Sequence, residues 1–238
     1  MQKDLPLYIS VLFICTVVLT VVLLYYVLKG SANRHIAAKA GVLMIPLVCW
    51  LTVQASLASY GVYYNNLAAT PPKIMLYGIL PMGFFIMLLF VFKKGRKFID
   101  SLPMRTLTFL HIIRIPIEIS LFLLFTYGAV PKLMTFEGLN FDVLSGLTAP
   151  LVAYFGFHKE RINHKILLTW NLLCLALLIN VVVIGVFSAP TPMQQFAFDQ
   201  PNTALLNFPY CWLPTFIVPT VLFSHLVTLR KLLIPSMT

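Results

Sequence analysis

Residues 105–128 read RTLTFLHIIRIPIEISLFLLFTYG, and they have the length and apolar character of a membrane-spanning helix. The stretch nevertheless carries His111, Arg114 and Glu118 at positions i, i+3 and i+7, which share one face of a helix. A charge near the bilayer centre costs roughly 2.5–3.5 kcal/mol on insertion scales, so such residues usually face the interior of a helix bundle. The stretch therefore predicts a transmembrane helix that carries a buried polar site.

Two further features of this helix bear on its geometry. Arg114 and Glu118 are one turn apart, so we expect them to pair. Pro116 lies between them and has no N–H, which leaves the carbonyl of Ile112 without its helical partner. A kink or a local polar contact is expected there.

The composition of the whole chain is that of a membrane protein. Of the 238 residues, 60% are hydrophobic and only 10% are charged, whereas a soluble domain usually carries about 25% charged residues. Long runs contain no charged residue, and a run of about 20 apolar residues is enough to cross the hydrocarbon; these runs are 5–28, 40–72, 74–92, 166–198 and 200–229. We therefore predict an all-α, polytopic membrane protein whose single domain covers residues 1–238.

The runs divide into seven predicted transmembrane helices, over about 6–28, 38–61, 73–92, 104–128, 142–157, 165–188 and 208–231. With this division, thirteen of the 17 Lys and Arg residues fall on one side of the membrane, three (Lys3, Lys73 and Lys132) fall on the other, and Arg114 lies within a helix. Basic loops face the cytoplasm, so the N-terminus is predicted outside and the C-terminus in the cytoplasm. The expected location is the plasma or inner membrane.

The net charge of +10 favours lipid rather than nucleic acid as the partner. The basic residues lie in short segments between apolar runs, which is the pattern of loops that face anionic lipid. The four cysteines form no CxxC motif, so neither a zinc site nor a c-type haem is indicated. No GxSxG, HExxH or P-loop motif occurs, and nothing in the sequence therefore identifies an enzyme.

Polar residues inside the predicted helices form two layers. At about 1.5 Å of rise per residue, one layer lies about 8–9 Å from the basic end of each helix and contains His111, Asn171 and His225. The other lies about 20–22 Å in and contains Gln54, Glu118 and Asn180, and Arg114 lies between the layers. We predict that these side chains line a hydrated site or path; the alternative is that the amides and histidines hydrogen-bond helices together.

The loop over residues 188–207 is long and contains Pro190, Pro192 and Pro201, which exclude a long regular helix. We expect it to be a plain connector. The alternative is that it covers the outer mouth of the bundle.

Three hypotheses about function remain open. The first is binding or transport of a small molecule or a proton, in which Glu118 is the protonatable group and Arg114 its counter-ion or an anion clamp. The second is a membrane oxidoreductase subunit that binds quinone or b-type haem, with His111 and His225 as the haem ligands. The third is a receptor or assembly factor without chemistry. The transport hypothesis and the receptor hypothesis require no cofactor.

Overall fold

The computed structural model describes residues 5–157 and 164–234, and within these residues it contains helices and no strand. Lys3, Lys159 and Arg161, which entered the prediction of topology, lie outside the described residues. The helical elements are α1 Leu7–Lys29, α2 Arg34–Ala38, α3 Ala40–Ser59, η1 Met75–Ile79, α4 Leu80–Val91, α5 Lys93–Asp100, α6 Met104–Leu110, η2 His111–Ile113, α7 Arg114–Thr126, η3 Lys132–Met134, α8 Val143–Phe155, α9 His164–Phe187, η5 Ala204–Leu206, η6 Leu213–Ile217 and α10 Val218–Leu233.

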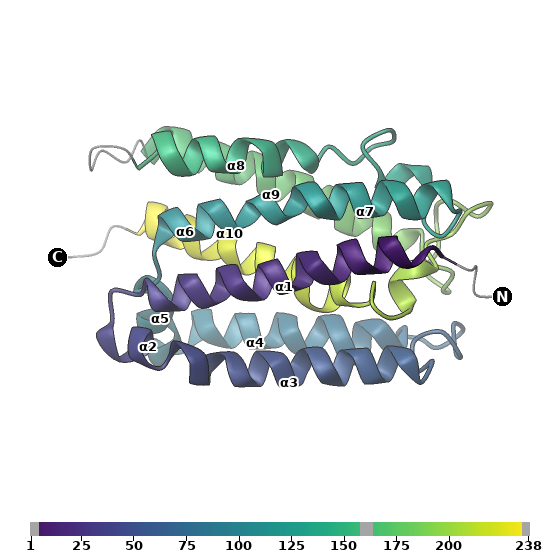
Figure 1. The fold of residues 1–238 in the computed structure, drawn as a ribbon, viewed down its shortest axis with the longest axis horizontal. Coiled ribbons are helices and arrows are strands. Elements are labelled where there is room, and N and C mark those ends of the chain that lie inside the picture. The colour runs from purple at the N-terminus through teal and green to yellow at the C-terminus, as the bar shows by residue number, and fades with distance from the viewer. Residues whose placement is uncertain (1–4, 158–163, 235–238) are drawn as a thin grey trace.

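The long helices run side by side, and the chain passes back and forth between the two ends of the bundle (Figure 1). The start of α1 lies at one end, together with the loops over residues 60–74, 128–142 and 188–207; we call this the N-terminal end. The end of α10, α2 and the basic helix α5 lie at the opposite end, which we call the basic end. The side of the membrane that each end faces stays a prediction.

Five helices are long and apolar enough to cross a membrane: Leu7–Lys29, Ala40–Ser59, Met104–Thr126, His164–Phe187 and Leu213–Leu233. Met75–Val91 and Lys93–Asp100 would add a sixth span if taken together, but the chain bends by 91° between them. The predicted helix over 142–157 is α8, which has only 13 residues where about 20 are needed. The structure thus supports a helical membrane protein with five or six candidate spans, and the seventh span is not confirmed.

The surface of the bundle carries large apolar side chains in the way a lipid-facing surface requires. Leu7, Phe155 and Leu173 expose 77%, 69% and 62% of their area. In a soluble protein such contiguous apolar surface would promote association, whereas in a bilayer it contacts lipid tails. The interior cluster includes Phe13 of α1 and Leu121 of α7, so α1 packs onto the centre of the bundle.

A side chain of α3 stabilises the irregular turn that precedes Pro81 at the start of α4. A π-helical turn, Met75–Ile79, precedes this proline, which cannot donate to the carbonyl of Tyr77 four residues earlier. That carbonyl accepts a hydrogen bond from Gln54 Nε2 at 3.0 Å instead. A side chain of α3 thus supplies the hydrogen-bond donor that the carbonyl of Tyr77 lacks because of Pro81.

Pro219 repeats this arrangement in the last helix. A π-helical turn, Leu213–Ile217, precedes it, and the carbonyl of Thr215 loses its helical donor. Trp50 Nε1 on α3 donates to that carbonyl at 3.0 Å. Helix α3 therefore donates a hydrogen bond to both of the π-helical turns, η1 and η6.

A departure from regular α-helix, which Pro116 predicts, lies one turn earlier. The helix Met104–Thr126 is interrupted by a 3₁₀ turn, His111–Ile113, which contains the carbonyl that Pro116 leaves free. Arg114 is the first residue after the turn. The break therefore lies at the base of the predicted polar site.

Candidate functional site

Arg114 is buried at the centre of the bundle and has partners from three other elements. Its Nη1 donates to Asp142 Oδ1 at 2.5 Å and to the backbone carbonyl of Cys174 on α9 at 3.2 Å. Its Nη2 lies 2.7 Å from Nε2 of His225 on α10. The sequence predicted that Arg114 would pair with Glu118. In the structure its ion-pair partner is Asp142 instead.

Asp142 reaches Arg114 because the loop before α8 enters the bundle. Thr135 and Asn140 in this loop are fully buried, and Asp142 exposes only 5% of its area. The chain therefore begins α8 at the depth of Arg114 instead of at the membrane surface. This start explains why α8 is a short helix.

Glu118 is buried one turn beyond Arg114, with 2% of its area exposed. Both of its carboxylate oxygens accept from Nδ2 of Asn140, at 2.7 and 2.8 Å. Asn140 Nδ2 also donates to the carbonyl of Met134, which holds the amide in place. Among residues 5–157 and 164–234 no cationic side chain lies within 4 Å of this carboxylate, so its charge is not paired.

The contacts of His225 define its protonation. Arginine has no acceptor, so Nε2 of His225 must accept from Arg114, and the ring is the neutral form with its proton on Nδ1. Nδ1 then donates to Oδ1 of Asn171 on α9, and Nδ2 of Asn171 donates back to the carbonyl of His225 at 3.1 Å. Asn171 therefore orients the imidazole that in turn positions Arg114.

His111 lies against His225, with the ring centroids 4.2 Å apart and the planes inclined by 35°. Its Nε2 is 3.1 Å from the hydroxyl of Ser224, which donates to the carbonyl of Leu107. The hydroxyl can therefore accept the proton of Nε2. The two histidines of the basic-end layer are neighbours, as the matched depths predicted.

The stacked geometry is incompatible with the haem hypothesis for this pair. Two imidazoles that bind one iron through Fe–N bonds of roughly 2 Å would place their ring centroids about 6 Å apart with the porphyrin between them. His111 and His225 are instead in direct ring contact at 4.2 Å. The haem alternative is therefore not supported by this arrangement of the two rings, whose direction could not be inferred from their depth.

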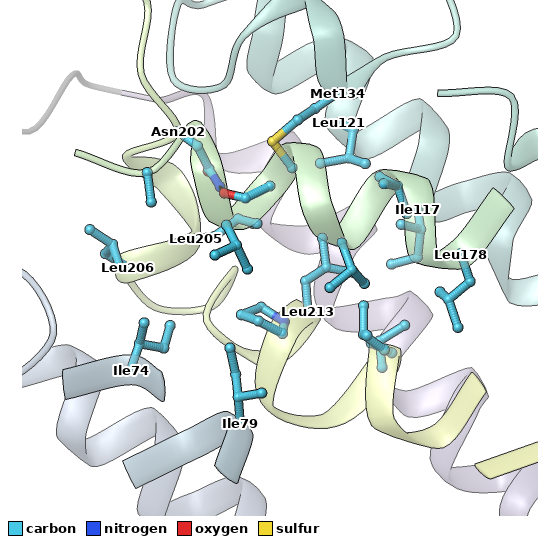
Figure 2. Close-up of a pocket in the computed structure, with 18 of the residues that line it drawn as sticks. Ile74, Ile79, Ile117, Leu121, Met134, Leu178, Asn202, Leu205, Leu206 and Leu213 are labelled. Atoms are coloured by element: carbon cyan, nitrogen blue, oxygen red, sulfur yellow. Dashed lines mark hydrogen bonds between the residues drawn. The ribbon is translucent and has the colours of Figure 1, made fainter. Parts of the chain in front are cut away.

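A cavity of about 120 Å³ lies beside this network (Figure 2). Its wall is almost entirely apolar, and side chains from η1, α7, α9, η5 and η6 converge on it; among them are Ile74, Ile79, Ile117, Leu178, Leu206 and Leu213. On α9 the lining runs from Leu178 to Val186, which corresponds to about 12 Å along the helix. Arg114, Glu118 and Asp142 also line it, so the buried charges border an elongated apolar space.

The structure divides the seven candidate site residues into three groups. Arg114 and Glu118 line the cavity, and His111, Asn171 and His225 form the network behind Arg114. Gln54 lies elsewhere, because it bonds the carbonyl of Tyr77 and accepts from Tyr63 at 2.5 Å; Asn180 donates to the carbonyl of Leu139. The hydrogen bonds of these two amides agree with the alternative interpretation, in which polar side chains join segments of the bundle.

A second, larger hollow of about 610 Å³ lies at the N-terminal end and has a more polar lining, which includes Tyr64 and Gln200. The segment of residues 202–206 separates the two spaces. Asn202, Leu205 and Leu206 line the apolar cavity, whereas Thr203 and Ala204 line the polar hollow. The loop over 188–207 therefore lines both spaces, and that it covers the cavity stays a prediction.

The model of a protein family described as a domain of unknown function, DUF8737, matches residues 71–233. The chain belongs to this family. No curated protein and no solved structure matches the chain. The DUF8737 part contains every residue that lines the apolar cavity, from Pro72 to Val221, whereas α1 and α3 precede it.

Asp142 and Asn140 of the DUF8737 part were missed as site residues by the sequence analysis, which placed Asn140 between two predicted helices and Asp142 at the outer end of one. One signal could have found them. The run from residue 142 to 157 is too short to cross the hydrocarbon, so a loop that enters the bundle was the better interpretation. An acidic residue at the entry of such a short helix is a candidate partner for a buried arginine.

Proposed function

We propose that this membrane protein binds a small molecule inside its helix bundle and passes it across the membrane. The apolar body of the molecule would occupy the cavity, and its polar group would lie beside Arg114, Glu118 and Asp142. One observation carries the proposal: an otherwise apolar cavity is bordered by three buried ionisable side chains. Binding pockets typically combine an apolar lining with a small number of convergent polar groups.

The volume of the cavity limits the size of the molecule. An engineered cavity of about 150 Å³ in another protein holds one benzene molecule. A space of about 120 Å³ therefore suits a molecule, or part of one, with about six non-hydrogen atoms. The elongated lining on α9 favours a chain over a wide ring system.

The polar hollow at the N-terminal end supports passage in addition to binding. It lies on the other side of the 202–206 segment from the cavity. Movement of this short segment would connect the two spaces, and many transporters bind their substrate near the bilayer midplane under such a cover. We propose the plasma or inner membrane as the location, with the N-terminal end outside.

Photolabelling of the purified protein in lipid nanodiscs tests the proposal. The probe is a short-chain alkyl alcohol with about six non-hydrogen atoms besides its diazirine nitrogens, and mass spectrometry locates the labelled residues. We expect saturable labelling of the cavity wall, at Leu178 and Val182 of α9. Labelling of the lipid-facing Leu173, which is 62% exposed, should rise linearly with probe concentration.

A matched pair of variants provides the control. Val182→Phe adds volume to the cavity wall and should abolish the saturable component, because no comparable space remains. Leu173→Phe makes a similar change on the outer surface of the same helix and should leave that component unchanged. Saturable labelling that survives Val182→Phe, or its absence in the unmodified protein, would contradict binding in this cavity.

A further inference from the structure

The formal charges that border the cavity do not balance. Arg114 is paired with Asp142, and together they are neutral. Glu118 contributes a further carboxylate, whose hydrogen-bond partner in the described part of the chain is the neutral amide of Asn140. An ionised Glu118 would therefore leave one negative charge in an apolar, membrane-embedded space, which is costly unless something neutralises it.

The free hydrogen-bonding atoms of the wall lead to the same conclusion. A carboxylate offers about four acceptor positions, and on Glu118 one N–H group of Asn140 serves both oxygens. Oδ1 of Asn202, a residue that is 2% exposed and lines the cavity (Figure 2), has no hydrogen-bond partner among the described residues. Against these acceptors stand two N–H groups of Arg114: Nε, which has no partner among the described residues, and the second N–H of Nη2, whose other N–H contacts His225. The wall thus offers more acceptors than donors.

From this imbalance we propose that the molecule bound in the cavity is a small lipophilic amine, whose ammonium group pairs with Glu118 while its alkyl chain fills the apolar space. An ammonium carries one positive charge, which would balance the charge of Glu118, and three N–H donors, which would serve the excess acceptors of the wall. A carboxylate ligand would add a second unpaired negative charge. The inference rests on the proposed function and specifies its substrate class.

The same carboxylate can bind either a proton or the ammonium. With a protonated Glu118 the three ionisable groups are neutral in sum. With an ionised Glu118 they sum to −1, and the bound ammonium brings the total of the four charges back to zero. Binding is then an exchange: the ammonium forms an ion pair with the carboxylate, and the proton of the carboxyl group leaves to the solvent. The charged groups near Glu118 are Arg114 on its own helix and Asp142 at the start of α8, and they neutralise each other.

Competition against the alcohol photolabel tests this inference with three probes of equal chain length: pentylammonium, pentanol and pentanoate. We expect pentylammonium to suppress labelling of the cavity at a concentration lower than that of pentanoate by about tenfold or more, with pentanol between them. In Glu118→Gln the preference for pentylammonium over pentanol should disappear. Glu137→Gln makes the same change at an exposed carboxylate outside the cavity and should retain the preference.

The possible results separate this inference from the proposed function. Equal competition by all three probes, or a preference for pentanoate, would overturn the amine inference while binding in the cavity stands. Failure of the alcohol itself to label the cavity overturns both. A second measurement does not depend on photolabelling: in weakly buffered solution, saturation with pentylammonium should release one proton per protein, and Glu118→Gln should release none. Release that persists in Glu118→Gln would overturn the exchange.

Discussion

Arg114 and Asp142, which are 28 positions apart in the sequence, are joined by a 2.5 Å contact between Nη1 and Oδ1 in the centre of the bundle. The contact is made where the 128–142 loop enters the interior. There the loop supplies Asn140 to Glu118 and starts α8 at mid-depth. The ion pair therefore anchors the end of the loop beside the cavity, next to the carboxylate of Glu118.

Breaking this ion pair from either side should destabilise the protein strongly. Arg114→Gln and Asp142→Asn each leave one buried charge without its partner, so we expect each to lower the free energy of unfolding by about 3–5 kcal/mol. The double variant should lose less than the sum of the two, because no unpaired charge remains. Denaturant titration of the protein in detergent micelles measures all three.

Two controls accompany this cycle. Glu137→Gln removes the partner of Lys132 in an exposed pair at 3.8 Å and should cost at most about 1 kcal/mol. Glu118→Gln combined with Arg114→Gln should depart from additivity by less than the 114/142 pair does, since Arg114 contacts Asp142 directly and is not the ion-pair partner of Glu118. Strict additivity between positions 114 and 142 would show that the contact does not contribute to stability.

The polar residues of the central helix show what periodicity can and cannot predict. Spacing alone placed His111, Arg114 and Glu118 on one inward face, and all three are buried. The missing N–H of Pro116 predicted the break that became the turn His111–Ile113. These conclusions depend on local geometry, which the sequence contains.

Partners across the bundle could not be predicted in the same way. Depth along a helix gives one coordinate, whereas a contact also requires the rotation and the neighbours of that helix. Gln54 and Glu118 have similar depths, but Gln54 bonds the carbonyl that Pro81 frees and Glu118 borders the cavity. Asp142 was missed because its depth was inferred from the membrane surface, while its loop turns inward.

The tautomer of His225 provides a second prediction. ¹⁵N NMR of histidine-labelled protein should show His225 protonated on Nδ1, because Nε2 accepts from Arg114. Asn171→Leu removes the acceptor of that proton and should change the signal, with a loss of about 1–3 kcal/mol of stability. Asn180→Leu alters a partly exposed amide of the same helix, whose partner is the carbonyl of Leu139, and should leave the His225 signal unchanged. A His225 protonated on Nε2 would contradict the contact with Arg114.

The orientation in the membrane is a third prediction, and exposed positions at the two ends of the bundle test it. In a variant without native cysteines, Asp199→Cys at the N-terminal end should react with a membrane-impermeant thiol reagent added to intact cells. Lys94→Cys, on α5 at the basic end, should react only after the cells are permeabilised. The reverse pattern would invert the orientation, and reaction of both positions in intact cells would show that the two ends do not face opposite sides.

The last prediction concerns the 202–206 segment, which separates the polar hollow from the apolar cavity. Its backbone is held by hydrogen bonds from Thr203 and Ala204 to the carbonyl of Ala129. Just before it, Gln200 Nε2 donates to the carbonyls of Val130 at 2.6 Å and Phe125 at 3.1 Å. Local opening depends on such contacts, so their loss should raise the population of the open form.

A cysteine at Leu178 reports this opening, since the residue lines the cavity and is 4% exposed. In a background without native cysteines, Leu178→Cys should react slowly with a small water-soluble thiosulfonate. Gln200→Ala should raise that rate by about tenfold, as follows from the loss of two hydrogen bonds of about 0.5–1.5 kcal/mol each. Gln195→Ala changes an exposed glutamine of the same loop and should leave the rate unchanged. An equal rate in all three proteins would show that reagents reach the cavity by another route, such as from the lipid, and that the 202–206 segment is not its cover.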